Sequence, residues 1–352
     1  MSTRRKIVFA LLSTILFCLL LEVGFWIAYP LAGGDVAALH AYRDFVVDRK
    51  VRYYAPHPYT LYTFNPASSD VNSDGFLGPA LPPREKPEGT LRIACLGGST
   101  TASGNEASFK GSYPFFLEQE LEESLGREVE VLNFGVNAWT TAETVVNYVL
   151  NVQDYSPDLV LIHHAVNDAG PRFYPDYRSD YSHYRKSWEL PQKHWLDRLL
   201  TASSDLWAWA RSRKHFQTID VAYAVNRPFR AGTSQIRDGR FPEGSELGFV
   251  RNIRTIVELT RIAGGETVLV TMPCDERGAA PDEAVTLGVR ENNALLRRLA
   301  SEEGLLLIDL EQSMPVTDER VSRNYIDRVH FEPDGNAMKA EQIASALLAH
   351  WR

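Results

Sequence analysis

Five residues of this 352-residue chain combine the types that acyl transfer needs: Ser99, Gly135, Asn167, Asp327 and His330. A serine hydroxyl is a weak nucleophile at neutral pH, and a neighbouring imidazole such as that of His330 can take its proton during attack. Asp327 can fix the histidine tautomer and stabilise the imidazolium. The tetrahedral oxyanion needs fixed N–H donors, which the backbone of Ser99 and Gly135 and the Asn167 amide can supply.

The elements that must position these residues alternate along the chain. Apolar strands are predicted at 93–96, 129–134, 158–163, 266–272 and 305–310, and helices at 113–125, 141–155, 247–263, 282–303 and 334–351. Helices between buried strands predict an α/β fold, a doubly wound parallel five-stranded sheet flanked by helices. Because the carboxyl ends of parallel strands share one edge, residues that follow different strands become neighbours there.

Each residue also has a simpler interpretation when taken alone. Ser99 follows two glycines and can be a helix cap, Gly135 can be a plain turn, and Asn167 can cap a loop or helix. Asp327 and His330 can be a surface pair. Because these residues follow four different strands of one predicted parallel sheet, they converge at a single edge, and this favours the catalytic interpretation for the set.

The four blocks resemble those of the SGNH, or GDSL-like, hydrolase superfamily over roughly 91–352. The matching segments are Gly97-Gly98-Ser99-Thr100-Thr101, Asn133-Phe134-Gly135, Ala165-Val166-Asn167-Asp168 and Asp327-x-x-His330. The resemblance implies a three-layer, flavodoxin-like fold with Ser99 as nucleophile, Gly135 and Asn167 as oxyanion donors, His330 as base and Asp327 as its orienter. Gly98 stands where the name-giving motif has Asp, which leaves the chemistry intact. Ala165 stands where the third block usually has Gly.

Other site classes lack their motifs. An α/β-hydrolase would show Gly-x-Ser-x-Gly, but Thr101 occupies the place of the second glycine. Phosphate-binding and dinucleotide-binding glycine loops are absent from the sequence. The best metal ligands would be His163, His164 and Asp168, but their spacing matches no metal motif. We predict no cofactor and no catalytic metal.

The N-terminus predicts a membrane anchor. A basic tip at 1–6, with Arg4, Arg5 and Lys6, precedes an apolar segment at 7–29 that is long enough to span a bilayer. The basic cluster places the N-terminus in the cytoplasm and the catalytic domain in the periplasm or outside the cell. Glu22 is a cost to a spanning helix. A cleaved signal peptide is the alternative.

One further segment precedes the predicted domain at 91–352, and another is inserted within it. Residues 30–90 predict a juxtamembrane helix at 36–50 and an extended linker. An aromatic and arginine-rich insertion at 169–246, with a helix at 196–211, predicts a cap over the site; a satellite core is equally compatible. We predict substrate contacts at Asn137, Asp168, Arg172 and Tyr174. Whether Cys95 and Cys274 form a disulfide stays open.

These observations favour a membrane-anchored serine esterase that acts on a small acyl ester, such as an acetyl group on an envelope or extracellular carbohydrate. An O-acyltransferase with the same three residues is a second hypothesis, and a non-catalytic glycan-binding protein is a third. The net charge of -8 argues against nucleic acid as a partner. The sequence leaves the oligomeric state open.

Overall fold

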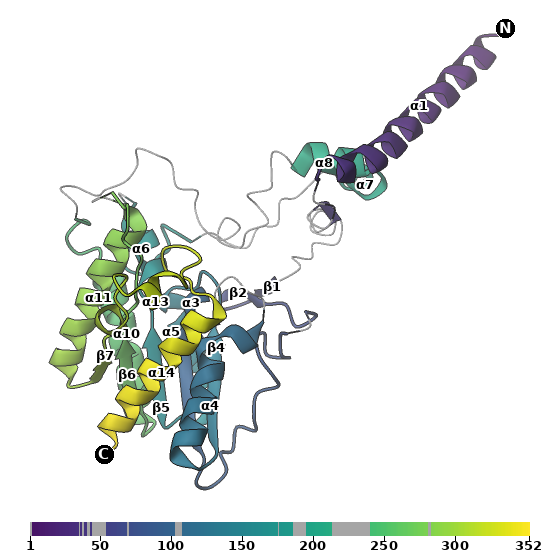
Figure 1. Cartoon of the computed structure of the whole chain (residues 1–352). Helices are drawn as coiled ribbons and strands as arrows, with labels where there is room; N and C mark the ends of the chain where they lie inside the picture. Colours follow the sequence, from purple (N-terminus) through teal and green to yellow (C-terminus); the bar gives the residue numbers. More distant parts are fainter. Residues whose placement is uncertain are drawn as a thin grey trace. The chain divides into compact units, whose positions relative to one another are not determined.

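The computed structural model describes residues 2–34, 36, 39–40, 43, 54–68, 70–102, 108–174, 176–185, 195–212, 240–280 and 283–352 (Figure 1). The chain divides into two compact units. The first, here the N-terminal unit, is Met1–Tyr54 with Trp188–Val225, and the second, the sheet unit, is Ala55–Ser187 with Asn226–Arg352.

The sheet unit is built on five parallel strands in the order β4-β3-β5-β6-β7. They are β3 (Leu91–Gly97), β4 (Val129–Gly135), β5 (Leu159–His163), β6 (Glu266–Val270) and β7 (Leu306–Ile308). Every residue of β3 and β5 is buried, as expected for strands covered on both faces. In the register, Gly97 lies opposite Gly135 on one side and His163 on the other, so these strands end together. The predicted α/β class is confirmed.

Helices cover both faces of this sheet (Figure 1). On one face α4 (Tyr113–Leu125) packs along α14 (Pro333–His350), and on the other α5 (Thr141–Leu150) packs along α10 (Leu247–Ile262). The helix α11 (Ala284–Glu303) lies against β6, β7 and α6 (Val166–Arg172). Alternate residues of β3 face the two layers, and Ile93 and Cys95 join the core formed with α4 and α14. This is the three-layer arrangement that the alternation of strands and helices predicts.

Most predicted elements lie within a few residues of those observed, with one difference inside the sheet unit. The sequence predicts one helix over 141–155, whereas α5 stops at Leu150 and a short 3-10 helix, η2 (Val152–Tyr155), follows. Asn151, with φ of -143° and ψ of -59°, breaks the helical backbone between them. Short helices α12 (Leu310–Ser313), α13 (Glu319–Ser322) and η1 (Phe109–Gly111) complete the unit.

The segment from Ala55 to Thr90 belongs to the sheet unit, so the compact unit begins before the predicted boundary at 91. It forms a two-stranded sheet of β1 (Tyr54–His57) and β2 (Leu61–Phe64). Tyr62 and Phe76 are buried. The buried Arg92 guanidinium, near the start of β3, donates to the carbonyls of Pro83 and Arg84 and so holds the end of the segment against this strand. The described part of this stretch therefore folds within the sheet unit.

The N-terminal unit contains α1 (Thr3–Leu31), α7 (Trp195–Ser203) and α8 (Asp205–Ser212). Two helices separated at Ser204 therefore replace the single helix predicted over 196–211. Both helices belong to the same compact unit as α1, and the cap over the site stays a prediction. The predicted helix at 36–50 lies almost wholly outside the described residues.

Candidate active site

Ser99 lies at the carboxyl edge of the sheet, two residues after β3 ends. It begins the four-residue helix α3 (Ser99–Ala102), so its backbone N–H is among the donors that a first helical turn leaves unpaired. The turn before it is tight. A Cβ at Gly97 would lie 2.0 Å from Thr101 Oγ1 and 2.8 Å from the His163 carbonyl oxygen, which only glycine avoids. The two glycines thus allow the strand to turn sharply and expose the serine.

The Ser99 hydroxyl, the His330 imidazole and the Asp327 carboxylate form a continuous series of hydrogen bonds. Ser99 Oγ lies 2.7 Å from His330 Nε2, and His330 Nδ1 lies 2.7 Å from Asp327 Oδ2. The histidine side chain is 15% exposed and the aspartate side chain 46%. With Nδ1 carrying the proton, Nε2 is free to accept the serine proton. This geometry suits a serine nucleophile with a histidine base.

The loop that carries Asp327 and His330 is fixed at both ends. Tyr325 and Phe331 form an isolated antiparallel bridge, with ring centroids 4.2 Å apart. The Arg328 guanidinium binds Glu283 at 2.9 Å and also donates to the carbonyls of Asp275 and Arg277. The loop is therefore held as a narrow hairpin with His330 facing Ser99.

The charge on Asp327 is maintained by its hydrogen bonds. Partial burial alone would raise the pKa of Asp327, but His330 Nδ1 and the backbone N–H groups of Val329 and His330 all donate to this carboxylate. Together they outweigh burial and hold its pKa well below the usual range. Asp327 is ionised at neutral pH and can stabilise a protonated His330.

Asn167, in the first turn of α6, approaches the serine loop closely. Its Nδ2 donates to the Trp139 carbonyl at 2.9 Å, which leaves its second N–H for another acceptor. A Cβ placed on Gly98 would lie 2.4 Å from this Nδ2 atom. The amide therefore occupies the space beside the residue that precedes Ser99, where the predicted oxyanion donor must lie.

Gly135 does not fit its predicted role as a donor. Its N–H is already donated to Asn133 Oδ1 at 3.0 Å, and its Cα faces α3 so closely that a Cβ would lie 2.4 Å from the Ala102 nitrogen. Its small size serves packing. Three residues later, Ala138 adopts φ of +59°, a left-handed conformation that costs an alanine free energy. Within the described residues its N–H has no acceptor, so Ala138 is the better candidate donor.

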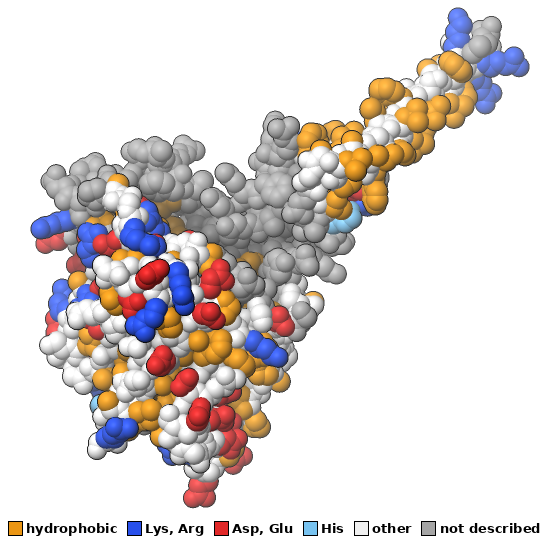
Figure 2. All heavy atoms as spheres, viewed as in Figure 1, with side chains coloured by type: hydrophobic (Ala, Val, Ile, Leu, Met, Phe, Trp, Pro, Cys, Tyr) orange, Lys and Arg blue, Asp and Glu red, His pale blue; other side chains and the backbone are white. Residues whose placement is uncertain are grey.

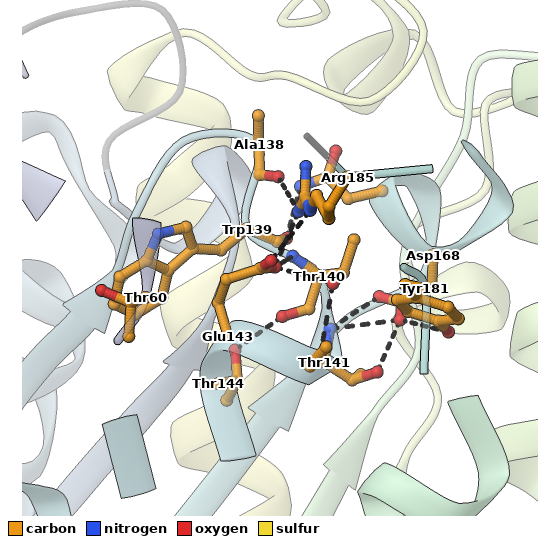
Figure 3. A network of polar contacts seen from close by, with 12 residues as sticks. Thr60, Ala138, Trp139, Thr140, Thr141, Glu143, Thr144, Asp168, Tyr181 and Arg185 are labelled. Atoms are coloured by element: carbon orange, nitrogen blue, oxygen red, sulfur yellow. Dashed lines mark hydrogen bonds and ion pairs between the residues drawn. The ribbon is translucent and has the colours of Figure 1, made fainter. Parts of the chain in front are cut away.

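The loop around Ala138 is held by three side chains from three different segments. The carbonyls of residues 137, 138 and 139 accept hydrogen bonds from Tyr62 Oη, Arg185 Nη2 and Asn167 Nδ2, respectively. Arg185 in turn binds Glu143, and Figure 3 shows this pair beside Ala138. Burial alone would lower the pKa of Arg185, but the Glu143 carboxylate raises it, so the guanidinium stays charged. The loop is thereby kept rigid, as a preorganised oxyanion site requires.

Two of the predicted substrate contacts have structural roles instead. Asp168 is fully buried and accepts from Thr141 and from Tyr181 Oη at 2.9 Å (Figure 3). Burial raises the pKa of Asp168 to about 7, although these donors oppose the shift. Arg172 is 3% exposed and donates to Ser245 and Asn292. Their polar atoms are committed inside the fold.

The other two predicted contacts differ from each other. Tyr174 is 8% exposed and packs against the rings of His183 and Tyr184. This burial does not suit a direct substrate contact. Asn137 is half-buried next to Ala138 and is the one predicted contact that lies in the site loop.

The histidines and cysteines near the strand ends are buried. His164 Nε2 lies 2.8 Å from Thr144 Oγ1, and burial lowers the pKa of His164 to about 3. His163 Nδ1 faces the Val270 carbonyl. The described residues contain no group of three or more potential metal-ligating side chains. Cys95 and Cys274 are both free thiols.

A buried lysine lies behind the serine helix. Lys339 of α14 is 1% exposed, donates to the Thr100 carbonyl at 3.3 Å, and sits 5.3 Å from the centroid of the Tyr113 ring. Burial lowers the pKa of Lys339 from 10.5 to about 7. Between pH 7 and 10.5, Lys339 is therefore protonated in the unfolded chain and mostly unprotonated in the folded one. Raising the pH from 7 towards 10.5 therefore favours the folded state, by up to about 1.4 kcal/mol per pH unit.

We expect Lys339→Met to remove this part of the pH dependence, because methionine has a similar shape and no proton to release. The variant should be more stable than the wild type at pH 7, and its advantage should shrink as the pH rises. Urea unfolding of both full-length proteins in detergent at pH 7, 8 and 9 measures the difference. Equal slopes of unfolding free energy against pH would contradict a buried, titrating Lys339.

A parallel α/β sheet with a Ser99–His330–Asp327 series at its carboxyl edge is an arrangement that serine hydrolases use. Residues 95–338 match the model of the GDSL-like Lipase/Acylhydrolase family, and the chain belongs to that family.

Solved structures similar to this chain include hydrolases from two bacteria. The lipase/acylhydrolase from Enterococcus faecalis is 19% identical, with a TM-score of 0.44 over 74% of this chain and 96% of that one. An acetylxylan esterase from Geobacillus stearothermophilus is 14% identical, with a TM-score of 0.45 over 73% of this chain and 94% of that one. No curated protein matches the chain.

Proposed function

We propose that this protein is a serine esterase that removes a small acyl group, such as the acetyl group of a carbohydrate ester, through an acyl-enzyme intermediate on Ser99. The observation that carries the proposal is the unbroken series of hydrogen bonds from Ser99 Oγ through His330 to Asp327. A nucleophile, base and orienting carboxylate in contact form the arrangement that activates a serine.

The reaction follows from these contacts. Ser99 Oγ attacks the ester carbonyl carbon while its proton passes to His330 Nε2. The carbonyl oxygen becomes an oxyanion, for which the Ser99 N–H, the Ala138 N–H and the Asn167 amide are the proposed donors. Collapse expels the alcohol, which takes its proton from His330. Water then attacks the acyl-enzyme by the same route and releases the acid.

We further propose that α1 is an uncleaved anchor with its N-terminus in the cytoplasm and the sheet unit outside. The helix has 29 residues, none of them buried, and it is long and apolar enough to cross a membrane. Figure 2 shows the hydrophobic side chains along it and basic side chains near its start. Positive charge before a span favours retention of that end in the cytoplasm.

A covalent probe tests the serine mechanism directly. We expect a fluorophosphonate to add one phosphonyl group to the Ser99 peptide of the full-length protein, as measured by mass spectrometry. Ser99→Ala should abolish both this labelling and the hydrolysis of 4-nitrophenyl acetate. Ser73→Ala, which removes an exposed serine of the same unit, is the matched control and should change neither.

Substrate class and acceptor are measured in the same assay. A panel of acetylated oligosaccharides and longer acyl esters ranks the acyl group and the alcohol, and a free sugar tests transfer in place of hydrolysis. Labelling that persists in Ser99→Ala would refute the serine mechanism. Glycan binding without turnover of any ester would favour a binding protein instead.

A further inference from the structure

The insertion helices are attached to α1 through a carboxylate inside the apolar segment. Glu22 accepts hydrogen bonds from the backbone N–H groups of Asp205 and Leu206, at the start of α8, and from Ser204 Oγ at 2.7 Å. A helix N-terminus has unpaired donors and a positive dipole end, so it stabilises a carboxylate at this point. Burying the Glu22 carboxylate in a membrane costs free energy, and these donors from residues 204–206, remote in the sequence, offset that cost.

A second carboxylate strengthens the same attachment. Asp205 Oδ2 accepts from Trp26 Nε1 at 2.6 Å, one turn after Glu22 on α1, and Asp205 Oδ1 accepts from Arg43 at 2.8 Å. The Phe25 and Trp209 rings lie 5.7 Å apart beside these contacts. Each acidic group has donors on the opposite helix, so α8 is fixed at one level of α1, next to residues 22–26.

That level can be placed in a membrane by counting residues. At about 1.5 Å per residue, the 16 positions from Lys6 to Glu22 (22 minus 6) span about 24 Å. The hydrocarbon core of a bilayer is about 30 Å thick. With Lys6 at the inner boundary, Glu22 lies just inside the outer one, where an unpaired carboxylate is unfavourable. The start of α8 must lie at the same depth to satisfy it.

The exposed side chains of the two insertion helices suit such a position. On α7, Trp195 is 68% exposed, Leu196 44% and Leu199 55%. Leu199 lies four positions after Trp195 and three after Leu196, so these side chains share one side of the helix. On α8, Trp207 is 39% exposed, and Trp26 of α1 is 58% exposed. Tryptophan is enriched where hydrocarbon meets water, and amphipathic helices bury their apolar face at that boundary.

We propose that α7 and α8 form an interfacial hairpin, clamped to α1 through Glu22, whose apolar face is buried in the outer boundary of the lipid bilayer. We assign lipid as the partner of this apolar face. The hairpin is bound to the apolar helix α1 at residues 22–26, and exposed tryptophans lie on both. The inference rests on the proposed anchoring of α1 and adds a second membrane contact from the insertion. It also makes α1 a packing partner within the folded protein, which a cleaved signal peptide would not be.

Site-specific labels on the full-length protein test the depth of each part. In a Cys18→Ser background, single cysteines at Ile15→Cys, Leu199→Cys and Glu258→Cys carry the fluorophore NBD, and the protein is reconstituted in phosphatidylcholine–phosphatidylglycerol vesicles. Burial raises the pKa of the Cys95 and Cys274 thiols to about 12, so both stay unreactive during labelling. Glu258, exposed on α10 of the sheet unit, is the aqueous control.

We expect the labels at 15 and 199 to resist reduction by dithionite and to be quenched by brominated lipid, deep for 15 and shallow for 199. The label at 258 should be reduced at once. Rapid reduction of the label at 199, with the label at 15 still protected, would contradict the membrane contact of the hairpin but not the anchoring of α1. Rapid reduction of both labels would contradict the anchoring of α1 and the membrane contact of the hairpin together. Protection at 199 that depends on the protein-to-lipid ratio would identify a second copy, not lipid, as the occupant.

Glu22→Ala tests the clamp itself. Without the carboxylate, the first N–H groups of α8 lose their acceptor, and we expect the label at 199 to become accessible to dithionite while the label at 15 remains protected. Retained protection at 199 would refute the role of Glu22 as the clamp. Intact mass of the purified protein, with residues 2–31 present or missing, shows independently whether α1 is retained.

Discussion

Replacing Asp327 with asparagine should lower kcat for ester hydrolysis by about 10⁴-fold, the size of effect that a wrongly protonated histidine produces. The reason lies in the two oxygens of Asp327. Oδ1 accepts from the backbone N–H groups of Val329 and His330, both at 2.9 Å, and Oδ2 accepts from His330 Nδ1. In asparagine, the amide oxygen must take the Oδ1 place to satisfy both backbone donors.

The amide NH₂ of that asparagine then faces His330 Nδ1 and donates to it. Nδ1 becomes an acceptor, so the proton of the neutral ring moves to Nε2, which faces Ser99 Oγ. A protonated Nε2 cannot take the serine proton. Because the backbone bonds of the loop persist, the fold should be unchanged, and the loss should appear in kcat with little change in melting temperature.

Steady-state hydrolysis of 4-nitrophenyl acetate by Asp327→Asn, together with thermal unfolding, measures both quantities. Asp318→Asn is the matched control, because Asp318 also caps a backbone N–H, that of Arg320 in α13, in a nearby loop. It should leave kcat unchanged. A loss below tenfold for Asp327→Asn would mean that Asp327 does not set the tautomer of His330.

The sheet and the meeting of Ser99, Asp327 and His330 could be predicted because both follow from patterns that sequence carries directly. Buried parallel strands are continuous apolar runs, and their carboxyl ends converge at one edge. Residues that follow two different strands were therefore expected to be neighbours, and Ser99 Oγ does lie 2.7 Å from His330 Nε2. The resemblance of four short blocks to one family indicated the same residues.

The donor at Ala138 could not be predicted in the same way. Glycine is the residue expected where the backbone is unusual, so Gly135 was predicted to be the oxyanion donor. An alanine in a left-handed conformation, such as Ala138, cannot be recognised from the sequence. The support of its loop is equally hidden. Tyr62 and Arg185 lie far from residue 138 in the sequence, and only the tertiary fold brings their side chains to neighbouring carbonyls.

The contact between the insertion and α1 could not be predicted for a related reason. The insertion was expected to cover the site, because long connections in compact domains are often lids, and that expectation stays a prediction. The sequence feature that bears on the contact is Glu22, whose cost inside an apolar segment indicates that it needs a partner. A sequence shows that such a partner is needed, but not that the first N–H groups of α8 supply it.

A single methyl group at position 98 should also lower activity strongly. Gly98→Ala places a Cβ 2.4 Å from Asn167 Nδ2, too close for both to remain in place. Gly98 is outside the left-handed region, so alanine is compatible with its backbone and the cost falls on the amide. Displacement of one oxyanion donor lowers kcat by about 10²–10³-fold. Aspartate, which the family motif has here, should be at least as harmful in this chain.

A double-mutant cycle separates this mechanism from a general disturbance of the serine turn. Asn167→Ala alone should lower kcat by about the same 10²–10³-fold, and adding Gly98→Ala to it should cost little more, because the atom that the new methyl displaces is already gone. The two changes should therefore be strongly non-additive in kcat, with melting temperatures that stay close to that of the wild type. Losses that simply multiply would place the effect of residue 98 elsewhere and would remove the main support for Asn167 as an oxyanion donor.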